Sequence, residues 1–165
     1  MRAILLILVF IITFVISFPK QKVYFLILNN LSNYDIQLQT KNKNISPLGI
    51  DLKSNDIYMS KSQIGHIDSI DIGLFGLSLN NVKFSGTIKQ MIPDIKEVNI
   101  YLSMGEFLNI SGEFGKIVGN IDLIKREIKI IAKMDVNNYN RYKNIFGVFK
   151  QIKNKKGEYI YELNI

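Results

Sequence analysis

The stretch Ile64–Gly86, IGHIDSIDIGLFGLSLNNVKFSG, decides the fold because apolar and polar residues alternate along most of it. Side chains on a strand point alternately to the two faces of a sheet, so this period indicates strands with one apolar face. Gly76 and the pair Asn80-Asn81 supply turn or bulge signals. The stretch therefore predicts antiparallel strands joined by short turns. Its alternating apolar residues are Ile70, Ile72, Leu74, Leu77, Leu79, Val82 and Phe84.

The same period continues on both sides of this stretch. Turns are expected at Asn42–Pro47 and Lys53–Asp56, where polar residues cluster. Short strands that turn back after about eight to twelve residues favour a meander. The fold class predicted is mainly β: an N-terminal membrane helix followed by a curved antiparallel β-sheet meander with one or two short helices. Further strands are expected around residues 36–38, 48–52, 57–59, 98–102, 108–110, 121–123, 128–136 and 158–165.

Three segments depart from the period of two. Lys20–Tyr34 has apolar residues three and four apart, which predicts a short amphipathic helix, although the apolar run Val23–Leu28 also fits a strand. Thr87–Glu97 contains a proline inside a helical pattern, so a loop with one helical turn is expected. Asn137–Lys153 has an apolar helical face and a basic one. This last segment is expected to pack on the sheet as a helix, or to rest on lipid.

The chain starts with Met1–Phe18, MRAILLILVFIITFVISF, an apolar leader with one basic residue near its start. Its uncharged part, Ala3–Phe18, would extend about 24 Å as a helix, slightly less than the hydrocarbon core of about 30 Å. Residues 1–18 are therefore a predicted transmembrane anchor or signal segment, and residues 19–165 a single β-rich domain. The predicted anchor residues are Ile4, Leu5, Leu6, Ile7, Leu8, Val9, Phe10, Ile11, Ile12, Phe14, Val15, Ile16 and Phe18.

Composition excludes several classes of function. The chain has no cysteine, so disulfides, thiolate metal sites and cysteine nucleophiles are ruled out. The net charge of +7 is concentrated after Ile124, where ten Lys or Arg residues face four Asp or Glu. A basic end of this kind suits an anionic lipid surface or an acidic partner. Aromatic and basic residues do not interleave as they do in single-strand nucleic-acid platforms, so no nucleic acid is expected as a partner.

No catalytic set emerges from the sequence. His66 is the only histidine, so a zinc site or a Ser-His-Asp triad would depend on it alone. Asp68 and Asp71 are an odd number of residues apart, which predicts opposite faces of a strand and no shared proton. The glycines of Gly112–Gly119 lack the spacing of a phosphate-binding loop. No catalytic, cofactor-binding or metal-binding residue is predicted, and the protein is expected not to be an enzyme; a hydrolase built around His66 is the last alternative.

The apolar sheet faces must be covered. They can close against each other, or the sheet can curve around an apolar channel. A channel beside a membrane leader would suit acyl chains, because each buried CH₂ contributes about 0.8 kcal/mol.

The order of these segments resembles the type II secretion protein N and AsmA-like group of bacterial envelope proteins. The resemblance rests on the leader, the β segment Gly76–Gly86 and a late helix followed by the G-x-Y-x-Y-x-L strand Gly157–Leu163. It implies a single-pass protein of the bacterial inner membrane with its C-terminal domain in the periplasm. It also implies membrane lipid and envelope or secretion proteins as partners, and a role in secretion-complex assembly or lipid handling. The chain departs from the group in having no Trp. The alternative is a cleaved, secreted or surface-located β-rich binding protein.

Overall fold

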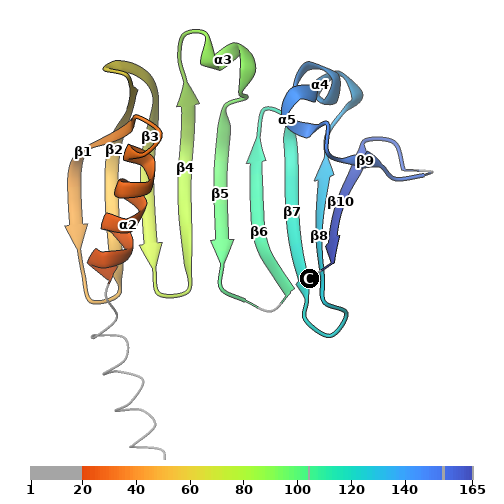
Figure 1. The fold of residues 1–165 in the computed structure, drawn as a ribbon, viewed down its shortest axis with the longest axis horizontal. Coiled ribbons are helices and arrows are strands. Elements are labelled where there is room, and N and C mark those ends of the chain that lie inside the picture. Colours follow the sequence, from red (N-terminus) through yellow and green to blue (C-terminus); the bar gives the residue numbers. More distant parts are fainter. Residues whose placement is uncertain (1–19, 104, 154, 165) are drawn as a thin grey trace, which may run out of the picture.

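The computed structural model describes residues 20–103, 105–153 and 155–164, which form one ten-stranded antiparallel sheet (Figure 1). Strands β1 to β8 follow one another in space as in sequence, and β10 then lies between β8 and β9. The strands are β1 (Ile36–Ile45), β2 (Gly49–Met59), β3 (Ser62–Gly73), β4 (Gly76–Phe84), β5 (Ile95–Tyr101), β6 (Gly105–Gly112), β7 (Gly115–Asp122), β8 (Glu127–Lys133), β9 (Lys150–Gln151) and β10 (Glu158–Asn164).

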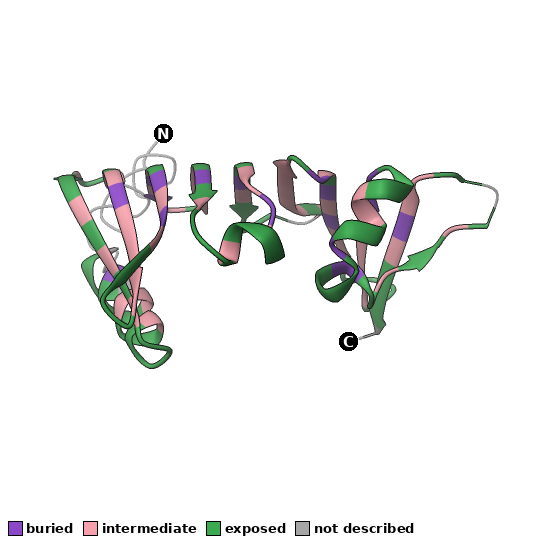
Figure 2. Cartoon of the chain, turned by 90° about the horizontal axis from the view of Figure 1, so that it is seen from above, coloured by how far each residue is buried: buried purple, intermediate pink, exposed green. Residues whose placement is uncertain are grey.

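The described residues contain four short helices, more than the one or two predicted, and these helices lie on one side of the curved sheet (Figure 2). Helix α2 (Lys20–Ser32) covers the first strands, and α3 (Ile88–Met91) sits between β4 and β5. Helices α4 (Val136–Arg141) and α5 (Lys143–Phe146) cover the last strands. Asp135 starts α4, because its carboxylate accepts a hydrogen bond from the backbone N–H of Asn138 at 2.7 Å.

One continuous apolar face runs across eight strands. Residues directly opposite each other in neighbouring strands share a face. One such row is apolar throughout. The row beside it on the other face is polar from β2 to β6, where it consists of Asp51, Asp71, Ser78, Asn99 and Asn109. The sheet is therefore amphipathic over most of its width. The apolar row is Leu52, Ile70, Leu79, Val98, Ile110, Ile117, Ala132 and Tyr159.

The alternation of faces shifts by one residue along a line across β2 to β5. A second row, Asn55, Ile67, Val82 and Ile95, belongs to the same face although it lies three residues from the first. Ser54 in β2 and Asn81 in β4 have φ of 55° and 51° at this line. The pairing register of β2 with β3 and of β3 with β4 is the same on both sides of this line, so the alternation shifts in neighbouring strands together, without an extra residue in either strand. We call this line the bend line; the sheet that contains it is curved (Figure 2).

Two apolar clusters lie on this face. The first joins α2 to β2, β3 and β4 through Tyr24 and the buried strand residues. The second joins α4 and α5 to β7, β8 and β10 through Tyr142 and Phe146. Ile95 packs against both clusters, so they form one layer.

The prediction of a mainly β protein built as an antiparallel meander is confirmed, and the sheet is open. Lys20–Ser32 is helical rather than extended, as the spacing of three and four within Lys20–Tyr34 predicted. The two early turn predictions are wrong in position. Strand β1 continues to Ile45, and Lys53–Asp56 lies inside β2. Lys53–Asp56 lies at the bend line, where Ser54 has a positive φ of the kind that turns also use.

The predicted helix over Asn137–Lys153 is wrong in extent. It divides into α4 and α5 at Tyr142, whose φ of −108° and ψ of 28° leave the helical range. Lys150 and Gln151 instead extend the sheet by pairing with β10. Pairing with a sheet edge therefore prevails over the helical period at the end of this segment.

The predicted anchor, residues 1–18, lies outside the described residues. Within the part of the chain that the structure describes, no helix is long and apolar enough to cross a membrane.

Candidate functional site: an apolar groove beneath helix α2

Helix α2 presents one face to the sheet through Tyr24, Ile27, Leu28 and Leu31. These residues are spaced by three, one and three, which places them on one side of a helix. Tyr24 is buried, with 8% of its surface exposed, whereas the other three are half-buried. The contact between α2 and the sheet is therefore tight at Tyr24 and looser toward Leu31.

The looser packing leaves a groove of about 510 Å³ between α2, α3 and strands β1 to β4. This size falls within the range of small-molecule sites, about 300–1,000 Å³. Many of the lining side chains are half-buried, so the groove opens to solvent. Besides the four α2 residues, its lining consists of aliphatic and aromatic residues from the strands and α3: Ile36, Leu38, Leu52, Ile57, Met59, Ile64, Ile67, Ile70, Ile72, Leu77, Leu79, Phe84, Ile88 and Ile92.

Asn55 is the buried polar residue beneath the groove, with 0% of its surface exposed. Its amide nitrogen donates to the backbone carbonyls of Leu52 and Ile67, each at 3.2 Å, and its oxygen accepts from Thr40 Oγ1 at 2.7 Å. Asn55 thus links the two rows of the bend line. Its hydrogen bonds are taken up within the protein, so it offers little to a ligand.

The ammonium group of Lys43 lies at one end of the groove. Lys43 Nζ lies 3.8 Å from the ring centroid of Tyr24 and 5.6 Å from that of Phe25. Lys43 pairs with Leu52 across β1 and β2, so it belongs to the apolar face. The site therefore combines an apolar lining with a positive charge at the end where α2 begins.

Asp94 holds the segment that carries α3. Its Oδ1 accepts from the backbone N–H of Phe84 at 2.9 Å, and its Oδ2 pairs with Lys89 Nζ at 3.2 Å. Burial acts to raise the pKa of Asp94, but the Phe84 N–H and Lys89 outweigh it and the pKa is lowered. The ionised carboxylate thus stabilises this side of the groove.

His66 lies on the polar face of the sheet, away from the groove. Its Nδ1 is 2.6 Å from Asp56 Oδ1, and its Nε2 is 3.5 Å from Asp68 Oδ1. The hydrogen bond with His66 lowers the pKa of Asp56, with a further contribution from Lys41. Within the described residues, no serine or threonine hydroxyl is hydrogen-bonded to His66. This arrangement is a cross-strand hydrogen bond between β3 and β2.

Asp68 and Asp71 lie on the same polar face, so the prediction of opposite faces is wrong. The bend line explains this, because Ile67 and Ile70, three apart, both point to the core. The two carboxylates have separate partners: Asn81 donates to Asp68 at 2.8 Å, and Ser69 donates to Asp71 at 3.4 Å. Burial, with a contribution from Asp51, raises the pKa of Asp71.

The sequence left open whether the apolar faces close against each other or line a channel, and it did not indicate where a channel would lie. The spacing of Tyr24, Ile27, Leu28 and Leu31 was the available signal for its roof. Across residues 20–103, 105–153 and 155–164, no three His, Asp or Glu side chains gather in a way that would hold a metal ion. Comparisons with protein families, curated proteins and solved structures found no match to this chain.

Proposed function

We propose that this protein is a non-enzymatic, membrane-anchored domain that holds a lipid acyl chain in the α2 groove. The groove itself carries the proposal, because its lining is apolar and its buried polar residue is already hydrogen-bonded. A ligand with hydrogen-bonding groups along its length would lose its water contacts there without replacement. An alkyl chain has no hydrogen bonds to water to lose, and each CH₂ that it buries contributes about 0.8 kcal/mol to binding.

Lys43 supports a ligand with an anionic head. The methylenes would lie beneath α2, and a carboxylate or phosphate would reach the ammonium group beside Tyr24. Free fatty acids and phospholipids share this chemistry.

The proposed location is the bacterial inner membrane, with the β domain in the periplasm. The apolar leader Met1–Phe18 and the resemblance to the secretion protein N and AsmA-like group support it. In that setting the domain would handle lipid during envelope biogenesis. Assistance in secretion-complex assembly is the other role that the resemblance implies.

Photolabelling tests this function. The full chain in membranes is exposed to palmitic acid carrying a diazirine in its alkyl chain, irradiated and digested, and the adducts are mapped by mass spectrometry. We expect adducts in α2 and in β2 to β4, reduced by excess unlabelled palmitate.

Two neighbouring substitutions make the test specific. Leu79→Trp fills the groove and should remove most of the labelling, whereas Ser78→Trp lies on the polar face and should leave it unchanged. Adducts spread over the polar face, or equal labelling of both variants, would refute the groove as the site.

A cleaved binding protein is the second candidate, favoured by the short apolar length of the leader. Mass determination of the mature amino terminus separates the two, since an anchored protein retains residues 1–18.

A further inference from the structure

The meander places four hairpin tips at one edge of the sheet, the lower edge in Figure 1. They join β1 to β2, β3 to β4, β5 to β6 and β7 to β8. Each tip exposes a large apolar side chain. The exposed fractions are 69% for Leu48, 69% for Phe75, 77% for Leu102 and 96% for Ile124. Since neighbouring strands are about 4.8 Å apart, the tips stand roughly 10 Å from one another.

Hydrogen bonds build these tips so that the apolar side chains face solvent. Ser46 Oγ accepts from the N–H groups of Leu48 at 3.3 Å and Gly49 at 3.0 Å. Asp122 Oδ1 accepts from the N–H groups of Ile124 at 3.1 Å and Lys125 at 3.0 Å. The side chains of Ser46 and Asp122 thus accept hydrogen bonds from backbone N–H groups of their turns, as is common in short turns. The apolar residues are therefore held outward by structured turns.

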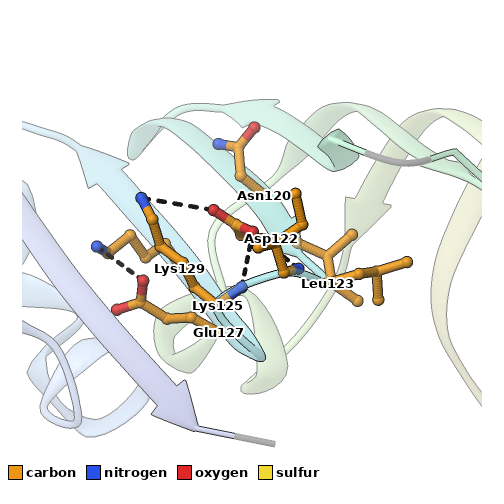
Figure 3. A pocket seen from close by; sticks show the side chains of 8 residues that line it. Asn120, Asp122, Leu123, Lys125, Glu127 and Lys129 are labelled. Atoms are coloured by element: carbon orange, nitrogen blue, oxygen red, sulfur yellow. Dashed lines mark hydrogen bonds and ion pairs between the residues drawn. The ribbon is translucent and has the colours of Figure 1, made fainter.

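Neighbouring tips are also connected. The N–H of Leu102 donates to the carbonyl of Phe75 at 2.7 Å, which joins the second tip to the third. An apolar hollow of about 460 Å³ between the third and fourth tips is lined by Leu102, Leu123 and six further residues. Figure 3 shows the fourth tip, where Lys125 pairs with Asp122 at 3.5 Å beside the pair of Lys129 and Glu127. The four tips thus form one edge with charged groups beside it.

The opposite edge differs in its two-residue tips. Ser60-Lys61 joins β2 to β3, and Glu113-Phe114 joins β6 to β7 with Phe114 only 2% exposed. Exposed apolar residues also lie at that edge, namely Tyr34 before β1, Met91 on α3 and Val136 on α4, but these three are not at a hairpin tip. At the lower edge, in contrast, every hairpin tip exposes a large apolar side chain.

Helix α2 begins at this same lower edge (Figure 1). Tyr24, near its start, contacts Lys43 close to the first tip. Phe25 and Leu26 in the same part of α2 are also exposed. Residues 1–19, which include the apolar leader, precede α2 and therefore join the domain at the edge that carries the apolar tips.

We propose that the four tips dock on the surface of a lipid bilayer and insert Leu48, Phe75, Leu102 and Ile124 among the headgroups. The proposal rests on the membrane location proposed above, and it adds an orientation: the sheet stands with its strands pointing at the membrane. Lys125 and Arg126 at the fourth tip are exposed and suit anionic headgroups. The Lys43 end of the α2 groove then faces the lipid, which would allow a chain to pass between bilayer and groove.

Single cysteines test the docking directly, because the chain contains none of its own. Phe75→Cys, Leu102→Cys and Ile124→Cys are labelled with a nitrobenzoxadiazole dye in the full chain. The protein is reconstituted in vesicles of phosphatidylcholine with a minority of phosphatidylglycerol and nitroxide-labelled lipid. Insertion to a depth of about 5–10 Å should make quenching about twofold or more stronger than at the control positions Lys61→Cys and Glu113→Cys.

Quenching at the tips no stronger than at the two controls would overturn the docking, and so would loss of the chain from the vesicles. Circular dichroism of each labelled variant checks that the sheet is retained, which we expect because all five positions are in turns. The result is independent of the groove. Groove labelling without tip quenching would refute the docking alone, and tip quenching without groove labelling would refute the proposed lipid holding alone.

Discussion

The two helix-covered halves of the apolar face are built on the same strand row but are filled differently. Under α4 and α5, aromatic rings occupy the space: Tyr139 stacks on Tyr159 at 4.1 Å, and Phe114 meets Phe146 at 5.3 Å between ring centroids. Under α2, the aliphatic side chains of Ile27, Leu28 and Leu31 leave a groove of about 510 Å³. A sheet face thus supplies the floor of a site, and the covering helix decides whether space remains above it.

The largest expected effect is in the filled half. Phe146→Ala removes a buried ring that touches Phe114 and Phe149, and should lower the free energy of unfolding by about 3–5 kcal/mol. Leu28 borders the groove and is only half-buried, so Leu28→Ala should lower the free energy of unfolding by less than about 2 kcal/mol. Thermal or urea unfolding followed by circular dichroism measures both. Equal losses would remove the distinction between the halves.

Enlarging side chains should have opposite results in the two halves. Ala132→Leu places extra methylenes in a site with 0% exposure and should cost about 1–3 kcal/mol. Ile57→Phe projects into the groove and should change stability by less than about 1 kcal/mol while reducing palmitate photolabelling. Unfolding curves measure the two changes in stability, and the photolabelling assay measures access to the groove. If Ile57→Phe lowered stability more than Ala132→Leu, the α2 half would be the tightly packed one.

The bend line should depend on one side chain. Asn55→Ala removes the donor to the carbonyls of Leu52 and Ile67, and leaving them unpaired should cost about 1–3 kcal/mol. Asn80→Ala, which removes a half-buried bond to Ser69 on the polar face, should cost less than Asn55→Ala. Parallel urea unfolding measures the difference. A loss at Asn80 as large as that at Asn55 would argue against a special role for the bend line.

Lowering the pH should gradually destabilise the half of the apolar face that lies under α2. This is the smallest of the expected effects. The pKa of Asp94 is lower folded than its ordinary value of 3.8, so its stabilising contribution is complete above that value. The contribution is lost as the pH falls through the folded pKa. Asp94→Asn should therefore be less stable than the natural chain at neutral pH, and the difference should shrink below pH 3.8. A difference independent of pH would show that the carboxylate charge is not responsible.

Much of the fold could be predicted because it rests on local patterns. Alternation within Ile64–Gly86 indicated strands of β3 and β4, and residues three and four apart indicated α2. The errors lie where long-range contacts decide. Lys53–Asp56 looks like a turn, yet the hydrogen bonds of Asn55 to neighbouring strand residues keep it inside β2.

The candidate site was only partly predictable. A membrane leader was expected and an apolar channel was one of two alternatives, but the roof of the groove and the cation beside it depend on contacts between segments. Lys43 and Tyr24 are far enough apart in sequence that no local pattern joins them. His66 was expected in a strand and lies in β3, where Asp56 is its partner from β2.

By itself the sequence determined most of the strands, their apolar face and the helix before them, because a period of two or of three to four residues acts within a few residues. Tertiary structure decided the rest: which half of that face stays open, where the alternation shifts, and which hairpin tips share an edge. These properties depend on strand register and on the side chains of distant segments. The same apolar pattern therefore forms a filled core at one end of the molecule and a groove at the other.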